Sequence, residues 1–226
     1  MIVLYPLLGF LLGALVNALA DALPVRRPVT LPAYLTRRAP LRLRDVAVHV
    51  AALALFGYLW TRYGEEDVVE LILVSFYTLV LLLVTVTDLE HRLIPNRAML
   101  PAIAVGVLAG PVRFGSGWPY ALLGGAVGFL FFYLAAWSGE RALGRGALGG
   151  GDVSLATFVG LISGFPQVFV ALVITLIAGG AISSVLLITR RATFRTAIPY
   201  GPFIVLGGFY AMVWGAEVIR WYASNY

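Results

Sequence analysis

Two aspartates lie where an apolar chain rarely keeps an ionisable side chain. Asp88 follows the apolar run 68–87, whose only charged residue is Glu70. Asp152 follows three glycines, 149–151, and opens a second apolar run. Ionisable groups at membrane depth are costly and usually serve a function. Two carboxyl groups that share one proton can act as base and acid on a water molecule, and such a pair can hydrolyse a peptide bond.

The local sequence predicts different roles for the two carboxyl groups. Asp88 is expected near the C-terminal end of a helix, where the helix dipole disfavours an anion. Asp152 is expected at the start of a helix, where backbone N–H groups favour an anion. We therefore expect Asp88 to hold the shared proton, Asp152 to be ionised, and the pair to titrate as a unit. The glycines before Asp152 also let the backbone approach a substrate closely.

Each aspartate alone also has a structural explanation. Asp152 after glycines is a good helix cap, and Asp88 could pair with Arg92 four residues later. A glycine-rich loop before a helix can bind phosphate, although no Walker lysine follows this one. His91 beside Glu90 is a weak candidate for metal binding, because a third ligand is missing and adjacent residues do not share a helix face. No metal site is therefore expected.

The composition is that of a membrane protein. The chain has 226 residues, of which 61% are hydrophobic and 12% are charged, and this charged fraction is about half that of a soluble domain. It has no cysteine, which excludes disulfides and thiolate metal sites. The net charge of +5 does not indicate nucleic-acid binding, because the arginines lie between apolar runs. The expected fold is all-α, a polytopic helix bundle that spans the lipid bilayer as a single domain, 1–226.

Apolar runs predict eight transmembrane helices. Their expected limits are 2–23, 46–62, 68–87, 98–112, 118–137, 153–163, 166–189 and 199–221. The fourth and sixth runs are the shortest. The first run begins without a basic segment and has no small-residue cleavage site before Asp21, so we expect it to be a retained span.

The arginines predict which side of the membrane each loop occupies. Thirteen of the sixteen arginines lie in the loops after the first, third, fifth and seventh runs. These are Arg26, Arg27, Arg37, Arg38, Arg42, Arg44, Arg92, Arg97, Arg141, Arg145, Arg190, Arg191 and Arg195. Arginine-rich loops remain in the cytoplasm. We therefore expect both termini outside, and both Asp88 and Asp152 at the cytoplasmic face.

Polar and helix-breaking residues predict further features of the bundle. Asn17 and His49 lie inside apolar runs, where we expect them to bond to neighbouring helices. Pro95 is expected to keep the chain after the third helix non-helical. Pro199 and Gly201 are expected to break the start of the last helix. That break is either one wall of a cleft or a simple turn from loop to helix.

Four segments of the chain resemble the type IV prepilin peptidases, the GxGD-type intramembrane aspartyl proteases of bacteria. The segments are Gly13-Ala14-Leu15-Val16-Asn17 with Leu23-Pro24, Asp88-Leu89-Glu90 with Ile94-Pro95-Asn96, Gly149-Gly150-Gly151-Asp152-Val153, and Ile198-Pro199-Tyr200-Gly201-Pro202-Phe203. They follow the order found in the family and are spread over most of the chain.

The resemblance implies an aspartic endopeptidase of type IV pilus or type II secretion systems. Such an enzyme cuts the basic leader of prepilins or pseudopilins at the cytoplasmic face of the bacterial inner membrane, and it needs no cofactor for that step. The resemblance makes Asp88 and Asp152 the catalytic pair. Residues expected to line the substrate cleft are Glu90, Pro95, Gly149, Gly150, Gly151, Pro199 and Gly201. The oligomeric state is left open.

The chain departs from many members of the family in the connection after its first helix. Those members carry an insertion with two Cys-x-x-Cys pairs, which binds zinc and accompanies N-methylation of the new N-terminus with S-adenosylmethionine. Here 24–44 is a short cytoplasmic loop without cysteine, so N-methyltransferase activity is not expected. His49 and Ser154 stand where the family usually has a glutamate and a lysine, and Ala14 and Ala22 replace its usual serine and arginine.

Two other functions also fit a pair of intramembrane aspartates. A transporter could bind protons or cations at such carboxylates. A non-catalytic subunit of a pilus or secretion assembly could share the motifs without cleaving anything. Cleavage of a prepilin peptide by the purified protein, with no ion gradient, would distinguish a peptidase from both.

Overall fold

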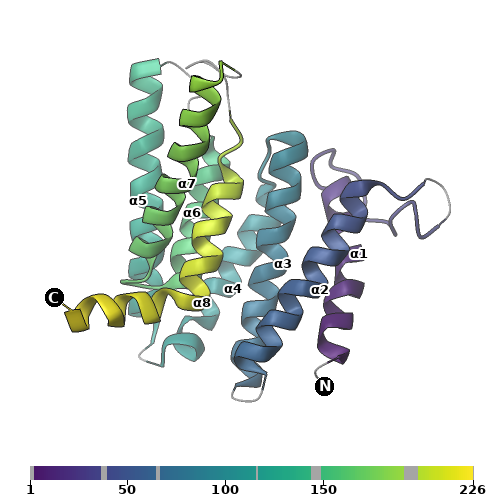
Figure 1. Ribbon diagram of the computed structural model, residues 1–226, viewed down its shortest axis with the longest axis horizontal. Coiled ribbons are helices and arrows are strands. Elements are labelled where there is room, and N and C mark those ends of the chain that lie inside the picture. Colours follow the sequence, from purple (N-terminus) through teal and green to yellow (C-terminus); the bar gives the residue numbers. More distant parts are fainter. Residues whose placement is uncertain are drawn as a thin grey trace. The chain divides into compact units, whose positions relative to one another are not determined.

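The structure, a computed structural model, describes residues 3–36, 40–64, 67–115, 117–143, 149–190 and 198–225. Over these residues the chain forms eight α-helices and no strand (Figure 1). They are α1 Leu4–Ala22, α2 Leu43–Tyr63, α3 Val68–His91, α4 Asn96–Phe114, α5 Trp118–Leu143, α6 Gly150–Ser163, α7 Val168–Ile188 and α8 Gly201–Asn225. Seven of them are long and apolar enough to cross a membrane, and α6 is a shorter apolar helix. The predicted all-α membrane bundle is confirmed.

Each predicted run corresponds to one helix, but several helices extend beyond their runs. Helix α3 continues to His91 instead of ending at Thr87, and the chain leaves the helix where Arg92 adopts a φ of 50°. Helix α5 continues to Leu143 instead of ending at 137. The cause is that hydropathy marks the part of a helix covered by lipid, whereas its ends reach into the headgroup region. With 14 residues, α6 is about 21 Å long, less than the ~30 Å of the hydrocarbon core.

Part of the predicted topology falls on residues outside the described part of the chain. These are Arg37, Arg38, Arg145, Arg191 and Arg195, and residues 37–39 of the predicted loop 24–44. Helix length and composition do not assign a side of the membrane. The placement of the termini therefore stays a prediction.

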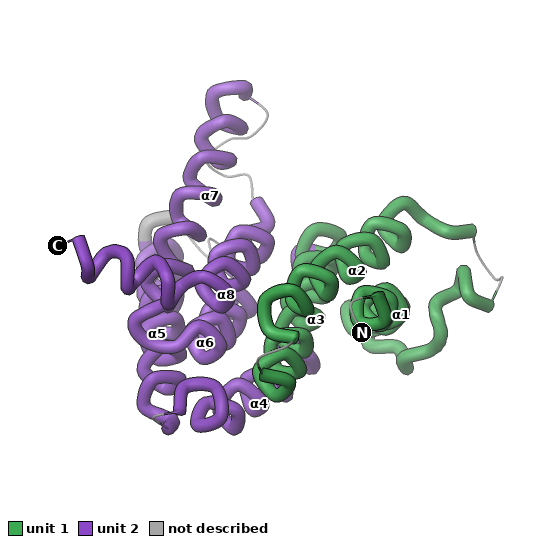
Figure 2. The backbone as a smooth tube through the Cα atoms, turned by 60° about the horizontal axis from the view of Figure 1, so that its bottom comes forward, with its two compact units in different colours: residues 1–91 green, residues 92–226 purple. Residues whose placement is uncertain are grey.

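The chain divides into two compact units, Met1–His91 and Arg92–Tyr226 (Figure 2). The first contains α1, α2 and α3, with Phe56, Tyr77 and Leu81 among its fully buried side chains. Helices α1 and α2 pack closely. A Cβ on Gly9 would lie only 2.6 Å from the side chain of Phe56. A Cβ on Gly13 would lie 2.8 Å from Nδ1 of His49. Small residues allow this close approach of helices in a membrane.

The second unit contains α4 to α8, and α6 contacts each of the other four helices. Gly124 and Gly128 of α5 face Ala156 and Gly160 of α6, and a Cβ on any of these glycines would collide with the backbone of the opposite helix. The spacing of four residues on both helices is typical of close helix pairs in membranes. This packing fixes the short α6, and with it the position of Asp152 at its start.

Candidate active site

Asp88 lies in the last turn of α3 and is buried, with 5% of its surface exposed. The preceding residue, Thr87, is fully buried, and its hydroxyl donates to the carbonyl oxygen of Val84 at 3.2 Å. The helix ends at His91, because Arg92 takes the left-handed conformation that commonly follows a helix. The predicted place of Asp88 at the C-terminal end of its helix is confirmed.

Asp152 is the third residue of α6. Its Oδ2 accepts a hydrogen bond of 3.0 Å from the backbone N–H of Gly149, the residue that caps the helix. The carboxylate therefore satisfies a backbone donor and lies at the positive end of the helix dipole. The prediction that Asp152 opens a helix is confirmed, although the capping position itself belongs to Gly149.

The glycines before Asp152 have different surroundings. A Cβ on Gly151 would lie 2.9 Å from the Cβ of Ile94, whereas a Cβ on Gly150 would meet nothing within 4 Å. Ile94 is buried and belongs to the non-helical segment 92–95 that follows α3. Close packing thus requires glycine at position 151 but not at position 150. The segment after α3 packs directly against the residue that precedes Asp152.

The predicted helix breakers lie before α4 and before α8. Pro95 caps α4, and its carbonyl oxygen accepts hydrogen bonds from the N–H groups of Ala98 at 2.9 Å and Met99 at 3.1 Å. Pro199 lies in the non-helical segment before α8, which begins at the buried Gly201. The prediction that Pro95 keeps the chain non-helical after the third helix is confirmed.

Tyr200 is not among the predicted cleft residues, although it lies in the matched segment 198–203 between two helix breakers. Its ring packs against Phe132 and Phe203, with ring centroids 6.1 and 5.6 Å apart. The ring also lies against Gly179, where a Cβ would come within 2.7 Å of it. Burial raises the pKa of the Tyr200 hydroxyl, and the negative charge of Asp152 raises it further. The phenol is therefore disfavoured in its ionised form by both its burial and the charge of Asp152.

A partly buried chain of hydrogen bonds holds the connection after α1 in place. Nδ1 of His49 donates to the carbonyl oxygen of Phe10 at 2.6 Å, and in this tautomer Nε2 is an acceptor. Nε2 accepts from the Tyr34 hydroxyl at 2.8 Å. The Tyr34 oxygen accepts from Nδ2 of Asn17 at 3.3 Å, and that amide also donates to the carbonyl oxygen of Asp45. Asn17 and His49 therefore bond to neighbouring helices, as predicted.

Three carboxylates and two arginines form an ion-pair cluster in the first unit: Asp21, Arg42, Arg44, Asp45 and Glu90. Arg42 contacts Asp21 at 2.9 Å and Asp45 at 3.3 Å. Arg44 contacts Asp21 at 3.0 Å and Asp45 at 2.7 Å. It also contacts Glu90 at 2.9 Å. Glu90, a predicted cleft residue, is thus held by an arginine from a neighbouring helix.

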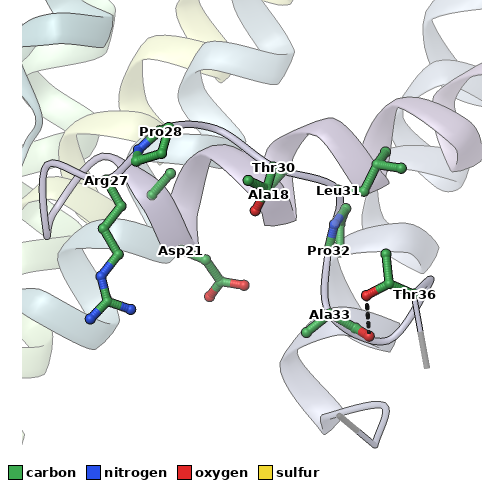
Figure 3. A pocket seen from close by; sticks show the side chains of 10 residues that line it. Ala18, Asp21, Arg27, Pro28, Thr30, Leu31, Pro32, Ala33 and Thr36 are labelled. Atoms are coloured by element: carbon green, nitrogen blue, oxygen red, sulfur yellow. Dashed lines mark hydrogen bonds between the residues drawn. The ribbon is translucent and has the colours of Figure 1, made fainter. Parts of the chain in front are cut away.

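The connection after α1 and the end of α1 line an open pocket of about 200 Å³ (Figure 3). Its walls include Asp21, Arg27 and Thr30. Figure 3 shows the connection curving past the end of α1, where the Thr36 hydroxyl donates to the carbonyl oxygen of Ala33 at 3.1 Å. Since Asp21 belongs to both the pocket wall and the ion-pair cluster, the cluster lies beside this connection.

Two of these contacts lie within the second unit, close in sequence to predicted site residues. Ile94 lies against Gly151, and the charge of Asp152 raises the pKa of Tyr200. Asp88 and Glu90 belong to the first unit. The pairing of Asp88 with Asp152 therefore stays a prediction.

Comparison with known proteins gives a consistent set of relatives. Residues 75–184, which include Asp88 and Asp152, match the model of the type IV leader peptidase family. A protein of Bacillus subtilis (strain 168), described as a prepilin leader peptidase/N-methyltransferase, is 30% identical over 179 residues, which cover 78% of this chain and 68% of that protein.

Two Pseudomonas proteins carry the same description. The protein of Pseudomonas putida is 29% identical over 188 residues, which cover 82% of this chain and 62% of that protein. The protein of Pseudomonas aeruginosa is 26% identical over 185 residues, which cover 82% of this chain and 63% of that protein. The chain therefore spans about two thirds of the length of these relatives. No solved structure matches the chain significantly.

Proposed function

The chain belongs to the type IV leader peptidase family, and from this premise we propose that Asp88 and Asp152 form the catalytic pair of a prepilin leader peptidase. Membership confirms the predicted family and its peptidase function, and it makes prepilins the expected class of substrate. The packing of Ile94 against Gly151 is the observation that carries the assignment of the pair. It joins the segment after Asp88 to the residue before Asp152.

The helix ends support a division of the acid and base roles. Asp152 is stabilised as an anion by the start of α6 and by the N–H of Gly149, so it takes a proton from the attacking water. Asp88 lies at the end of α3, where the dipole favours the neutral acid, so it gives its proton to the scissile carbonyl oxygen. The water oxygen then bonds to the carbonyl carbon, which yields a tetrahedral diol with no bond to the enzyme.

Collapse of the diol completes the reaction. One diol hydroxyl returns its proton to Asp88 while the C–N bond breaks. The leaving amine takes the proton that Asp152 received from water. Both carboxyl groups thus regain their starting states, and the products are a free carboxyl group on the leader and a free N-terminus on the pilin.

The substrate must reach the pair with its scissile bond exposed. A helical backbone hides each carbonyl in an internal hydrogen bond, so we propose that the prepilin enters as a helix from lipid and unwinds at the cytoplasmic boundary of the inner membrane. In this arrangement both termini of the enzyme lie outside. The residues proposed to line the cleft are Glu90, Pro95, Gly149, Gly150, Gly151, Pro199 and Gly201.

We propose that the cleavage is not followed by N-methylation. The relatives are described as both leader peptidases and N-methyltransferases. The present chain has no cysteine, and its connection between α1 and α2 is limited to residues 23–42. The zinc-binding insertion that accompanies methylation in the family has no counterpart in this connection.

The test is cleavage of a candidate prepilin by Asp88→Asn and Asp152→Asn variants. Asp67→Asn is the matched control, because Asp67 is exposed at the opposite end of α3, where its Oδ1 accepts from the N–H groups of Val69 and Glu70. After co-expression, mass spectrometry of the pilin reads cleavage from the new N-terminus and methylation from its mass.

The expected result is loss of cleavage in both catalytic-site variants and retained cleavage in the control. The purified protein should also cut a prepilin peptide in detergent, where no ion gradient exists. Full processing of the pilin by both Asn variants would show that Asp88 and Asp152 are not the catalytic pair.

A further inference from the structure

Arg44 connects three helix ends of the first unit. It is the second residue of α2, and 13% of its side chain is exposed. Its Nη1 donates to Oδ1 of Asp21 at 3.0 Å and to Oε2 of Glu90 at 2.9 Å. Its Nη2 and Nε donate to Oδ1 of Asp45 at 2.7 and 3.1 Å. One guanidinium therefore joins the end of α1, the start of α2 and the end of α3.

Arg42 is the natural comparison for Arg44. It contacts the same two aspartates, Asp21 and Asp45, but 53% of its side chain is exposed. Among the residues that the structure describes, Arg42 makes no ion pair with Glu90. Exposed ion pairs contribute little, whereas a shielded guanidinium that donates to several carboxylates fixes their geometry. The contact with Glu90 is what distinguishes the two arginines.

The contact with Glu90 acts on the turn of α3 that carries Asp88. The last carbonyl groups of a helix lack partners within the helix, so its last turn frays unless another contact holds it. Here the helix ends at His91, and the chain turns away through Arg92. Because backbone hydrogen bonds couple the residues of the last helical turns, a contact that holds Glu90 also holds the backbone from which the Asp88 carboxyl group extends. Residues two apart do not share a helix face, so Arg44 can act without touching the reacting atoms.

We propose that Arg44 is a positioning residue for Asp88: through Glu90 it holds the end of α3 and so sets the direction of the Asp88 carboxyl group. This inference rests on the proposed catalytic role of Asp88. In the sequence, Arg44 is one of thirteen arginines that predict the orientation of the loops. The structure gives it a second role at the end of the helix that bears a catalytic residue.

The experiment is a double-mutant cycle on the purified, full-length chain with a prepilin peptide as substrate. The variants are Arg44→Gln, Glu90→Gln and their combination, with Arg42→Gln and Arg42→Gln/Glu90→Gln as controls. Both kcat and KM are measured, and thermal unfolding in detergent reports the folded fraction. Glu90→Gln keeps the test informative if Arg44→Gln folds poorly, because Glu90 is partly exposed.

We expect Arg44→Gln and Glu90→Gln each to lower kcat about 10- to 100-fold, since a shift on the order of 1 Å at a catalytic group costs up to about that factor. The KM of Arg44→Gln should change little. The combined variant should be no slower than either single variant, because both remove the same contact. Arg42→Gln should keep kcat near that of the unmodified chain, and its effect should add to that of Glu90→Gln.

The outcomes separate this inference from the proposed function. If the unmodified chain does not cut the peptide, the proposed function fails. If the unmodified chain cuts the peptide and Asp88→Asn does not, the proposed function stands. Equal kcat values for Arg44→Gln and Arg42→Gln would then overturn only the positioning role of Arg44. Additive losses for Arg44→Gln and Glu90→Gln would overturn it as well, and so would losses that only follow the folded fraction.

Discussion

Substitution of Gly151 by alanine should separate the packing beside Asp152 from the chemistry of its carboxylate. The added Cβ would lie 2.9 Å from the Cβ of Ile94, whereas ordinary contacts begin near 3.4 Å, so the two segments must move apart by about 0.5 Å. Overpacking of this kind costs about 1–3 kcal/mol, and alanine recovers about 0.5–1 kcal/mol as the better helix former. We expect a net loss of stability of about 1 kcal/mol.

The effect of Gly151→Ala on catalysis should exceed its effect on stability. The displaced segment 92–95 begins the second unit and follows in sequence directly after α3, which bears Asp88. A shift on the order of 0.5–1 Å at a catalytic group lowers kcat by about 10- to 100-fold. Most of the Gly151→Ala protein should therefore stay folded. Its unfolding midpoint should fall by about 2–4 °C for each kcal/mol of unfolding free energy lost.

The assay compares Gly151→Ala with Gly150→Ala, the same chemical change one residue earlier. A Cβ on Gly150 meets nothing within 4 Å, so kcat and stability should stay close to those of the unmodified chain. If Gly150 lines the cleft, its added methyl group should change KM only. Purified variants are compared by peptide cleavage and by thermal unfolding. Equal kcat values for the two alanine variants would refute the packing argument.

Two further predictions concern hydroxyl groups. Tyr34→Phe removes the hydroxyl that joins Asn17 to His49. Leaving a buried polar group unpaired lowers the free energy of unfolding by about 1–3 kcal/mol. Thermal unfolding should show that loss, and an unchanged midpoint would contradict it. Asp152→Asn should lower the pKa of Tyr200, because the negative charge that disfavours the phenolate is removed. The pKa is read from the difference in tyrosinate absorbance between chains with and without Tyr200→Phe, and an unchanged value would place Asp152 too far away.

The sequence predicts those features of the site that depend on local rules. Asp152 after glycines predicts a helix start, and the structure places it third in α6. Asn17 and His49 in apolar runs predict bonds between helices, because lipid offers no partner, and both make them. The identity of Tyr34 as their common partner did not follow, because it lies in an irregular connection without a periodic pattern.

Features that depend on distant segments were not predicted. In the sequence, nothing distinguishes Arg44 from the other arginines of the predicted loops. Only the packing of three helices brings it to Glu90. The influence of Asp152 on Tyr200 depends on the packing of α6 against α8, which begins at the residue after Tyr200. The extension of α3 past Thr87 was missed for a different reason, because hydropathy falls where the helix leaves lipid, not where its hydrogen bonds end.

The convergence of Asp88 and Asp152 can be measured directly, because the chain has no native cysteine. Asp88→Cys/Asp152→Cys is treated with the shortest bis-methanethiosulfonate reagent, and linked peptides are identified by mass spectrometry. Asp67→Cys/Asp152→Cys is the control, since positions 67 and 88 are about 30 Å apart along the helix axis. A cross-link in the first variant and not in the control is the predicted result. A cross-link in the control alone would contradict a shared catalytic site.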